Sequence, residues 1–246
     1  MSGTNQPIEA LARGLRVLEA LSRSSGSMGN GQIARVTNLP PSTVSRLTDS
    51  LVRLGYLQMD STSGAYSLTA KNLRLGYPVL ANISILGRSQ RVLNTLSADT
   101  GLTSALAIRD GLHVATVATV RGRHPHSVSL AVGGRLPLAV SASGVALISG
   151  LEEPHKSRLV KEICAGLQAR GRSVGDFESQ LKACEETTVA VSRGAWHDDI
   201  GGMATPIRSG GQLFALGVVF KSNGTSAELG KLPVQALRRA AEELAD

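Results

Sequence analysis

The sequence predicts a two-domain α+β protein: an N-terminal winged helix-turn-helix, a linker helix, and a C-terminal domain in which helices flank an antiparallel sheet. Three observations lead to this fold class. Three short helical patterns precede a pair of short strand patterns within residues 1–70. A helical stretch follows, and beyond it strand patterns alternate with helices and meet at hairpin turns. We therefore expect domains at 1–70 and 85–246, with the linker helix at 71–84.

Apolar residues at helical spacing predict three short helices in the first domain. The expected helices cover residues 9–23, 31–37 and 41–54. The third follows a proline-containing turn and begins at Pro41, since proline suits the first position of a helix. Ser42 or Thr43 is expected to satisfy free N–H groups there, and Gly55 is expected to stop the helix.

Period-2 alternation beyond the third helix predicts a two-stranded wing. The expected strands are residues 56–60 and 65–69, with a turn at 61–64. The pattern is helical again over residues 70–96, and Pro78 is expected to interrupt or kink this stretch. We interpret it as a linker helix followed by the first helix of the second domain.

Strand and helix patterns mix in the second domain. The expected strands cover residues 103–109, 113–121, 127–132, 193–198, 202–208 and 212–220. The expected helices cover residues 141–150, 153–165, 176–189 and 232–244. Asp110 and Gly111, between the first two strands, are a strong hairpin signal. Strands that are interspersed with helices and joined by hairpins indicate an antiparallel sheet.

The chain is basic, with a net charge of +7, and the excess lies in its first half. Residues 1–70 carry six Lys and Arg against four Asp and Glu, and residues 71–140 carry eight against two. Residues 141–246, in contrast, carry twelve against thirteen. A basic first half suits a polyanionic partner such as nucleic acid.

Several classes of protein are not expected. The chain has no run of about 18 apolar residues, so we expect no membrane span. The N-terminus lacks the basic segment and apolar block of a secretory signal, which favours the cytoplasm. Cys164 and Cys184 lack metal-ligand spacing, and His124 and His126 lack flanking partners, so no metal or cofactor is expected. The chain has neither a hydrolase elbow nor a phosphate-cradling Gly-rich motif, so we expect no enzyme.

Residues 32–54 carry the strongest functional signal. A helix-turn-helix places the start of its second helix in the major groove of double-stranded DNA, where hydroxyl and basic side chains read bases. The residues expected to face the groove are Ser42, Thr43, Ser45 and Arg46. Arg35 and Arg53 are expected to hold the phosphate backbone. The alternative is a plain three-helix bundle whose Ser and Thr side chains merely cap.

Five segments share their pattern with a known family. They are residues 33–57, 66–69, 134–138, 141–144 and 204–207. Through them the chain resembles the isocitrate lyase regulator (IclR) family of transcription factors along nearly its whole length. The resemblance implies a GAF-like effector domain, a small-molecule effector, and a dimer or tetramer on a near-palindromic operator. On this basis we expect a ligand-responsive regulator, a repressor of a catabolic operon.

A helix is expected to open at Ser141. Unpaired N–H groups and the positive end of the helix dipole form a natural seat for a carboxylate, and small residues let a ligand approach the backbone. The expected ligand-binding residues here are Ser141, Ala142, Ser143 and Gly144. The alternative is an ordinary Ser cap with tight packing.

The family's polar pocket residues are not repeated in this chain. The resemblance implies an Asp, a Cys and two small hydroxyl residues, and the matching positions here are Ser192, Gly202, Gly217 and Val219. We therefore hypothesise a larger and more apolar pocket that takes an aromatic or other bulky acid. The residues expected to line it are Trp196, His197, Gly202 and Met203. His197 is the expected polar partner, and Trp196 is equally compatible with core filling.

Two other functions are compatible with the residues. One is an enzyme with an appended winged-helix domain, and the other is a module whose winged helix binds a protein instead of DNA. In the favoured interpretation the linker helix pairs two protomers. Effector binding then biases the placement of the two DNA-reading helices, which requires the effector to prefer one arrangement.

Overall fold

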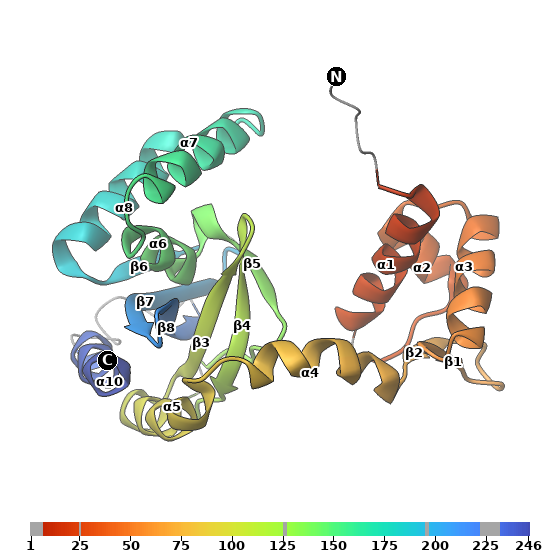
Figure 1. Cartoon of the computed structure of the whole chain (residues 1–246), viewed down its shortest axis with the longest axis horizontal. Coiled ribbons are helices and arrows are strands. Elements are labelled where there is room, and N and C mark those ends of the chain that lie inside the picture. Colours follow the sequence, from red (N-terminus) through yellow and green to blue (C-terminus); the bar gives the residue numbers. More distant parts are fainter. Residues whose placement is uncertain (1–6, 25, 125–126, 195–196, 222–231) are drawn as a thin grey trace. The chain divides into compact units, whose positions relative to one another are not determined.

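The structure, a computed structural model of the whole chain, describes residues 7–24, 26–124, 127–194, 197–221 and 232–246. It divides into two compact units, Met1–Asn82 and Ile83–Asp246 (Figure 1). The predicted fold class is confirmed, because the first unit holds three helices, a hairpin and the linker helix, and the second holds an antiparallel sheet flanked by helices. In the part of the chain that the structure describes, no helix is long and apolar enough to cross a bilayer.

Three helices form the first unit's core. They are α1 (Glu9–Ser22), α2 (Asn30–Thr37) and α3 (Pro41–Arg53). Asn38, in the left-handed conformation at φ 52°, ends α2 and turns the chain toward α3. The buried apolar side chains are spaced three or four residues apart, which is the pattern that predicted the helices. They include Val17, Leu21, Ile33, Val44 and Leu51.

The wing and the linker complete the first unit. Strand β1 (Leu57–Met59) pairs antiparallel with β2 (Tyr66–Leu68). A 3₁₀ turn, η1 (Ala70–Asn72), leads into α4 (Leu73–Ala81). Pro78 lies inside α4, and the helical stretch breaks about one turn later, at residues 82–85.

The second unit is built on a six-stranded antiparallel sheet with the order β5-β4-β3-β8-β7-β6. The strands are β3 (Thr103–Asp110), β4 (His113–Val120), β5 (Arg135–Pro137), β6 (Ala190–Arg193), β7 (Ile200–Ser209) and β8 (Gln212–Lys221). The predicted hairpin at Asp110 and Gly111 is confirmed, since Asp110 pairs with His113 and Gly111 has a φ of 59°. Gly210 and Gly211 make the corresponding turn between β7 and β8, with φ values of 56° and 72°.

Helices cover both faces of this sheet. They are α5 (Leu86–Thr100), α6 (Ala142–Ser149), α7 (His155–Gln168), α8 (Val174–Thr187) and α10 (Leu232–Leu244). Helices α5 and α10 pack together on one face, and α6 lies on the other, with α7 and α8 beyond it (Figure 1). The 3₁₀ turn η2 (Leu138–Val140) connects β5 to α6. This layering places the start of α6 directly against the sheet.

Two predicted strands are wrong. Residues 127–132 form no strand beyond an isolated bridge from Ser127 to Phe220. Gly133 and Gly134 take the place beside β4 instead, by exchanging backbone hydrogen bonds with Thr116. The strand expected at 193–198 lies earlier, at β6, where alternate residues from Ala190 onward are buried.

Candidate nucleic-acid interface and effector cavity

One face of α3 is exposed and polar. Ser42, Ser45 and Arg46 are exposed on this helix, and Thr43 is half-buried. Ser42 and Arg46 are four residues apart, so they lie on the same side of the helix. The opposite side packs into the core. The side chains buried there are Val44, Thr48 and Leu51.

The hydroxyl groups at the start of α3 do not cap it. The N-cap is Pro40, no side chain makes a cap hydrogen bond, and the amide of Thr43 donates to the carbonyl of Pro40 instead. The expectation that Ser42 or Thr43 satisfies the free N–H groups is therefore wrong, because proline occupies the N-cap. The alternative of a plain three-helix bundle in which these hydroxyls merely cap is therefore not supported at Ser42 and Thr43.

Asn30, which the sequence analysis did not single out, ties α2 to α3. Its side-chain Nδ2 donates to the hydroxyl of Ser45 at 3.2 Å, and the hydroxyl of Thr48 donates to its Oδ1 at 3.3 Å. Ser45 also donates to the carbonyl of Pro41 at 3.1 Å. Asn30 is separated from both partners by a turn, so sequence spacing carries no sign of these contacts. The bonds hold the exposed hydroxyl of Ser45 in one position.

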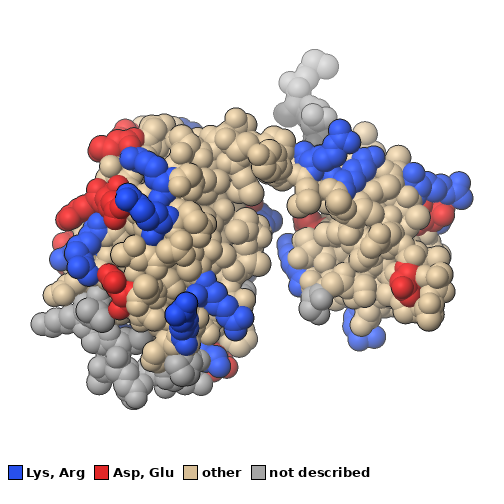
Figure 2. Space-filling model, turned by 90° about the horizontal axis from the view of Figure 1, so that it is seen from below, with Lys and Arg blue, Asp and Glu red and all other residues tan. Residues whose placement is uncertain are grey.

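The three arginines predicted to bind DNA differ in whether their guanidinium groups already have a partner within the chain. Arg46 and Arg35 are exposed, and neither guanidinium has a hydrogen bond or ion pair with any residue that the structure describes. Arg53 pairs with Asp49 at 3.1 Å on the exposed surface, where such a pair contributes little. Figure 2 shows basic side chains on this unit with fewer acidic ones beside them. Of these three arginines, Arg46 and Arg35 are therefore the two whose guanidinium groups are available to a new partner.

The turn of the wing is held by Asp60. Its carboxylate accepts hydrogen bonds from the amide of Ser63 at 2.7 Å, from the Ser63 hydroxyl at 2.8 Å and from the amide of Thr62 at 3.1 Å. These donors hold the pKa of the Asp60 carboxyl below its ordinary value of 3.8, the Ser63 amide most strongly. The charged form of Asp60 therefore shapes the tip of the wing.

We expect the wing turn to loosen in acid. Because the folded pKa of Asp60 is lowered, its contribution to stability is full above its unfolded pKa and is lost as pH falls through the folded value. An NMR titration should place the Asp60 carboxyl below 3.8, and Asp60→Ala should speed amide exchange at Ser63 near neutral pH. Asp60→Asn, which keeps an acceptor, should retain part of the protection. A carboxyl that titrates at its ordinary value would contradict this account.

Two of the four residues predicted at the start of α6 have structural roles. The hydroxyl of Ser141 caps the helix by accepting from the amide of Gly144 at 3.1 Å, and it donates to the carbonyl of Pro137 at 2.9 Å. Gly144 is buried, and a Cβ there would lie 2.1 Å from the carbonyl oxygen of Leu138. Ser141 is therefore an ordinary helix cap, which was the alternative to a ligand contact. The close approach of η2 to α6 requires a glycine at position 144.

Ala142 and Ser143, which lie between the cap residue Ser141 and the packed Gly144, have backbone amides without an acceptor among the described residues. No residue in the described part of the chain accepts a hydrogen bond from the backbone amides of Ala142 and Ser143. These amides point away from the helix at its positive end, where a carboxylate is favoured. Of the four residues predicted at the start of α6, Ala142 and Ser143 are thus the two whose backbone amides remain available to an acceptor.

Most of the predicted ligand-binding residues line one cavity. It is bounded by the start of α6, by β6, and by neighbouring parts of β7 and β8, and it includes Ser141, Ala142, Ser143, Ser192, Gly202 and Met203. Gly144 is not part of this lining, and His197 is exposed on the surface rather than at the cavity. Trp196 lies outside the described residues.

The cavity is apolar but narrow. Three of the four positions matched to the family's polar pocket, Ser192, Gly202 and Val219, are at its wall. Gly217 is not part of the wall, and a Cβ there would lie 2.7 Å from the carbonyl oxygen of Met203. The volume is about 40 Å³, which holds a few water molecules. The expectation of a larger pocket is therefore not met in this structure, in which the buried side chain of Met203 is part of the wall.

Neither cysteine is an activated nucleophile. Burial raises the pKa of the Cys164 thiol and of the Cys184 thiol, which is the opposite of what a nucleophilic cysteine needs. Among the residues that the structure describes, no three His, Cys, Asp or Glu side chains gather closely enough for a metal ion. Of the pair of histidines considered above, His126 lies outside the described residues.

Comparison with known proteins identifies both parts of the chain. Residues 10–61 match the IclR helix-turn-helix domain, and residues 77–246 match the bacterial transcriptional regulator IclR C-terminal domain. The chain is similar to the HTH-type transcriptional regulator TsaQ1/TsaQ2 of Comamonas testosteroni, with 34% identity over 71% of this chain and 60% of that protein. It is 28% identical to the transcriptional repressor IclR of Escherichia coli (strain K12), over 62% of this chain and 57% of that protein.

The matched region thus spans less than two thirds of the length of these two relatives. A crystal structure of an IclR family transcriptional regulator from Brucella abortus has the same fold, with a TM-score of 0.73 and 29% identity over 99% of this chain and 95% of that one. The C-terminal match alone covers more than half of the sequence. The chain belongs to the IclR family of bacterial transcriptional regulators.

Proposed function

We propose that this protein is a ligand-responsive transcriptional regulator, a repressor of a catabolic operon, and that it acts in the cytoplasm and not as an enzyme. The observation that carries the proposal is the exposed face of α3, where Ser42, Ser45 and Arg46 are presented without serving the fold as caps or ion pairs. The relatives support it, because they are named as a transcriptional regulator and a transcriptional repressor.

In the proposed complex α3 lies in the major groove of double-stranded DNA. Arg46 donates to a guanine edge, the hydroxyls of Ser42 and Ser45 contact bases or phosphates, and Arg35 holds the backbone. Protection of guanine N7 from methylation by dimethyl sulfate tests this directly, because N7 is exposed in the major groove. Protected guanines within the chain's own promoter region are expected. Binding to that DNA without any protected N7 would contradict a major-groove mode.

The effector in this proposal is an organic acid. Its carboxylate accepts hydrogen bonds from the amides of Ala142 and Ser143, and its body lies along the apolar wall near Gly202 and Met203. The apolar wall favours an aromatic or other apolar acid over a very small oxo-acid. Because the empty cavity is about 40 Å³, the flexible side chain of Met203 must move to admit such a ligand.

Filling the cavity is expected to remove acid binding. A Cβ at Gly202 makes only ordinary contacts, 3.4 Å to the carbonyl oxygen of Val218 and 3.7 Å to the Cβ of Ala142. Gly202→Val should therefore fold while occupying the ligand's place. Calorimetry on the full chain with benzoate and with glyoxylate should show tighter binding of benzoate, weakened at least tenfold in the variant. Tight binding of glyoxylate alone would overturn the apolar-acid assignment.

Self-association through α4 is also part of the proposal. No residue of this helix is buried, and its exposed apolar side chains include Leu73 and Tyr77, both 70% exposed. Such a surface is unfavourable in water and marks an interface. A second copy of the chain that covers α4 would supply the second reading helix that a near-palindromic operator requires.

Charge placed on this surface is expected to separate the protomers. Leu73 and Tyr77 are four residues apart and share one side of α4, so Leu73→Glu combined with Tyr77→Glu should raise the dimer dissociation constant at least tenfold. Sedimentation velocity measures the change. Arg74→Glu, an exposed charge reversal on the same helix, is the matched control. An assembly that is equally stable in all three proteins would place the interface elsewhere.

A further inference from the structure

A second cavity, larger than the one at α6, lies beneath α7. It is enclosed by α7, by the start of β4, by β5 and by η2, and its volume is about 410 Å³. Cavities of roughly 300–1,000 Å³ hold small organic molecules. Val140 lines both cavities, and the other lining residues differ. The two cavities are therefore separate sites that share one wall.

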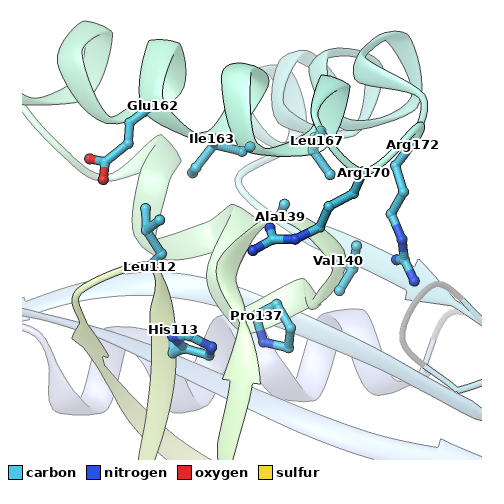
Figure 3. Close-up of a pocket in the computed structure, with 11 residues that line it drawn as sticks. Leu112, His113, Pro137, Ala139, Val140, Glu162, Ile163, Leu167, Arg170 and Arg172 are labelled. Atoms are coloured by element: carbon cyan, nitrogen blue, oxygen red, sulfur yellow. The ribbon is translucent and has the colours of Figure 1, made fainter. Parts of the chain in front are cut away.

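Most of the side chains that line this cavity are apolar. The apolar lining residues are Leu112, Pro137, Ala139, Val140, Ile163 and Leu167. Figure 3 shows them on both sides of the space, from α7 above and from the strands and η2 below. An apolar ligand body of one or two rings would remove this surface from water, which is favourable.

Basic groups gather at one end of the cavity. Figure 3 shows the guanidinium of Arg170 pointing into the space between α7 and the strands, with Arg172 beside Val140. The guanidinium of Arg170 has no hydrogen bond or ion pair with any residue within the described ranges, whereas the backbone amide of Arg170 donates to the carbonyl of Leu167. Glu162 lies at the other end of the lining (Figure 3). This arrangement favours an anionic group next to Arg170 and away from Glu162.

His113 adds a donor to the lining. Its Nδ1 lies 3.3 Å from Nη2 of Arg135. A guanidinium only donates, so Nδ1 accepts and the proton of the neutral ring is on Nε2. The lining therefore holds an imidazole N–H donor in addition to its two guanidinium groups, which again suits a carboxylate.

Gly166 leaves the space open. It lies inside α7 and lines the cavity, although glycine in a helix costs about 1 kcal/mol relative to alanine. Packing does not require it, since a Cβ there would meet only the flexible Nη1 of Arg170, at 3.6 Å. A larger side chain would project over the cavity and displace the Arg170 guanidinium.

We propose that the cavity beneath α7 is a second small-molecule site, which binds an organic carboxylate with an apolar body of one or two rings. The carboxylate pairs with Arg170 and accepts from His113, and the rings lie between the apolar side chains of α7 and those of the strands and η2, next to Gly166. The site does not depend on the effector cavity at α6, and a ligand here rests against Val140 from the opposite side.

The test uses 2-naphthoate and calorimetry on the full chain in the Gly202→Val background, where the cavity at α6 is filled. The probe should still bind, and adding Gly166→Leu or Arg170→Gln should weaken that binding at least tenfold. The matched controls on α7 are Ala165→Leu and Arg158→Gln. Both residues are exposed and neither lines the cavity, so the controls should bind as the background does.

Two results would overturn the proposal. One is the absence of 2-naphthoate binding in the Gly202→Val background up to the solubility limit of the probe. The other is equal binding by the Gly166→Leu and Arg170→Gln variants and their controls. Neither result bears on DNA reading by α3 or on acid binding at α6, so the failure of this site is distinguishable from the failure of the proposed function.

Discussion

Replacing Arg46 with alanine is expected to weaken binding to the operator about 10- to 100-fold, because a good base contact contributes about 1–3 kcal/mol. Arg46 is exposed on α3 four residues after Ser42, and its guanidinium has no partner among the described residues. The substitution therefore removes no contact that stabilises the fold. Fluorescence anisotropy with a labelled promoter duplex measures the loss.

The control for this substitution is Arg91→Ala. Arg91 is an exposed arginine of the second unit that pairs with Glu243 at 2.7 Å, so its loss changes the net charge equally without touching α3. Measuring the binding of random duplex as well shows whether Arg46 contacts bases or phosphates, because phosphate contacts do not depend on sequence. An equal loss on promoter and random DNA would assign Arg46 to the phosphates, and no loss on either would show that α3 is not the reading helix.

Gly144→Ala is expected to destabilise the second unit by about 3 kcal/mol, which is at the upper end for overpacking. The new methyl group would lie 2.1 Å from the carbonyl oxygen of Leu138 and 2.5 Å from its Cα, and backbone atoms do not yield as the end of a side chain does. Relief would require η2 to move away from α6. Urea unfolding of the full chain, followed by circular dichroism, measures the loss.

Gly175→Ala is the control for this glycine. It lies in the first turn of α8, where the nearest atom to a new Cβ is the hydroxyl oxygen of Ser173 at 4.0 Å. The same change should there be neutral or stabilising by up to about 1 kcal/mol. Equal unfolding midpoints for the two variants would show that η2 adapts to a side chain at position 144.

The sequence predicted an element correctly where neighbouring residues alone determine that element. Helical spacing through Val44 and Leu51 predicted α3, and the turn at Asp110 and Gly111 predicted the hairpin of β3 and β4. The strand expected at 127–132 is wrong, since β5 and the preceding Gly133 and Gly134 pair with β4, and residues 127–132 pair with the sheet only through the bridge from Ser127 to Phe220. Pairing partners are a tertiary property that alternation alone does not encode.

The same distinction between local pattern and tertiary contact applies to the candidate sites. The segment from Ser141 to Gly144 was predicted from its small residues, but its division into a cap, two free amides and a packed glycine depends on η2. The contact between Asn30 and Ser45 and the cavity beneath α7 join segments that are distant in sequence. No local pattern predicts either of them.

The most direct test of the central claim is a competition experiment with the wild-type chain. Labelled duplex from the chain's own promoter region is bound and then displaced by unlabelled promoter or random duplex, at several salt concentrations, since the phosphate contribution falls with salt. The account predicts a preference for the promoter sequence of about 1,000-fold or more. Equal displacement by both duplexes at every salt concentration would contradict it.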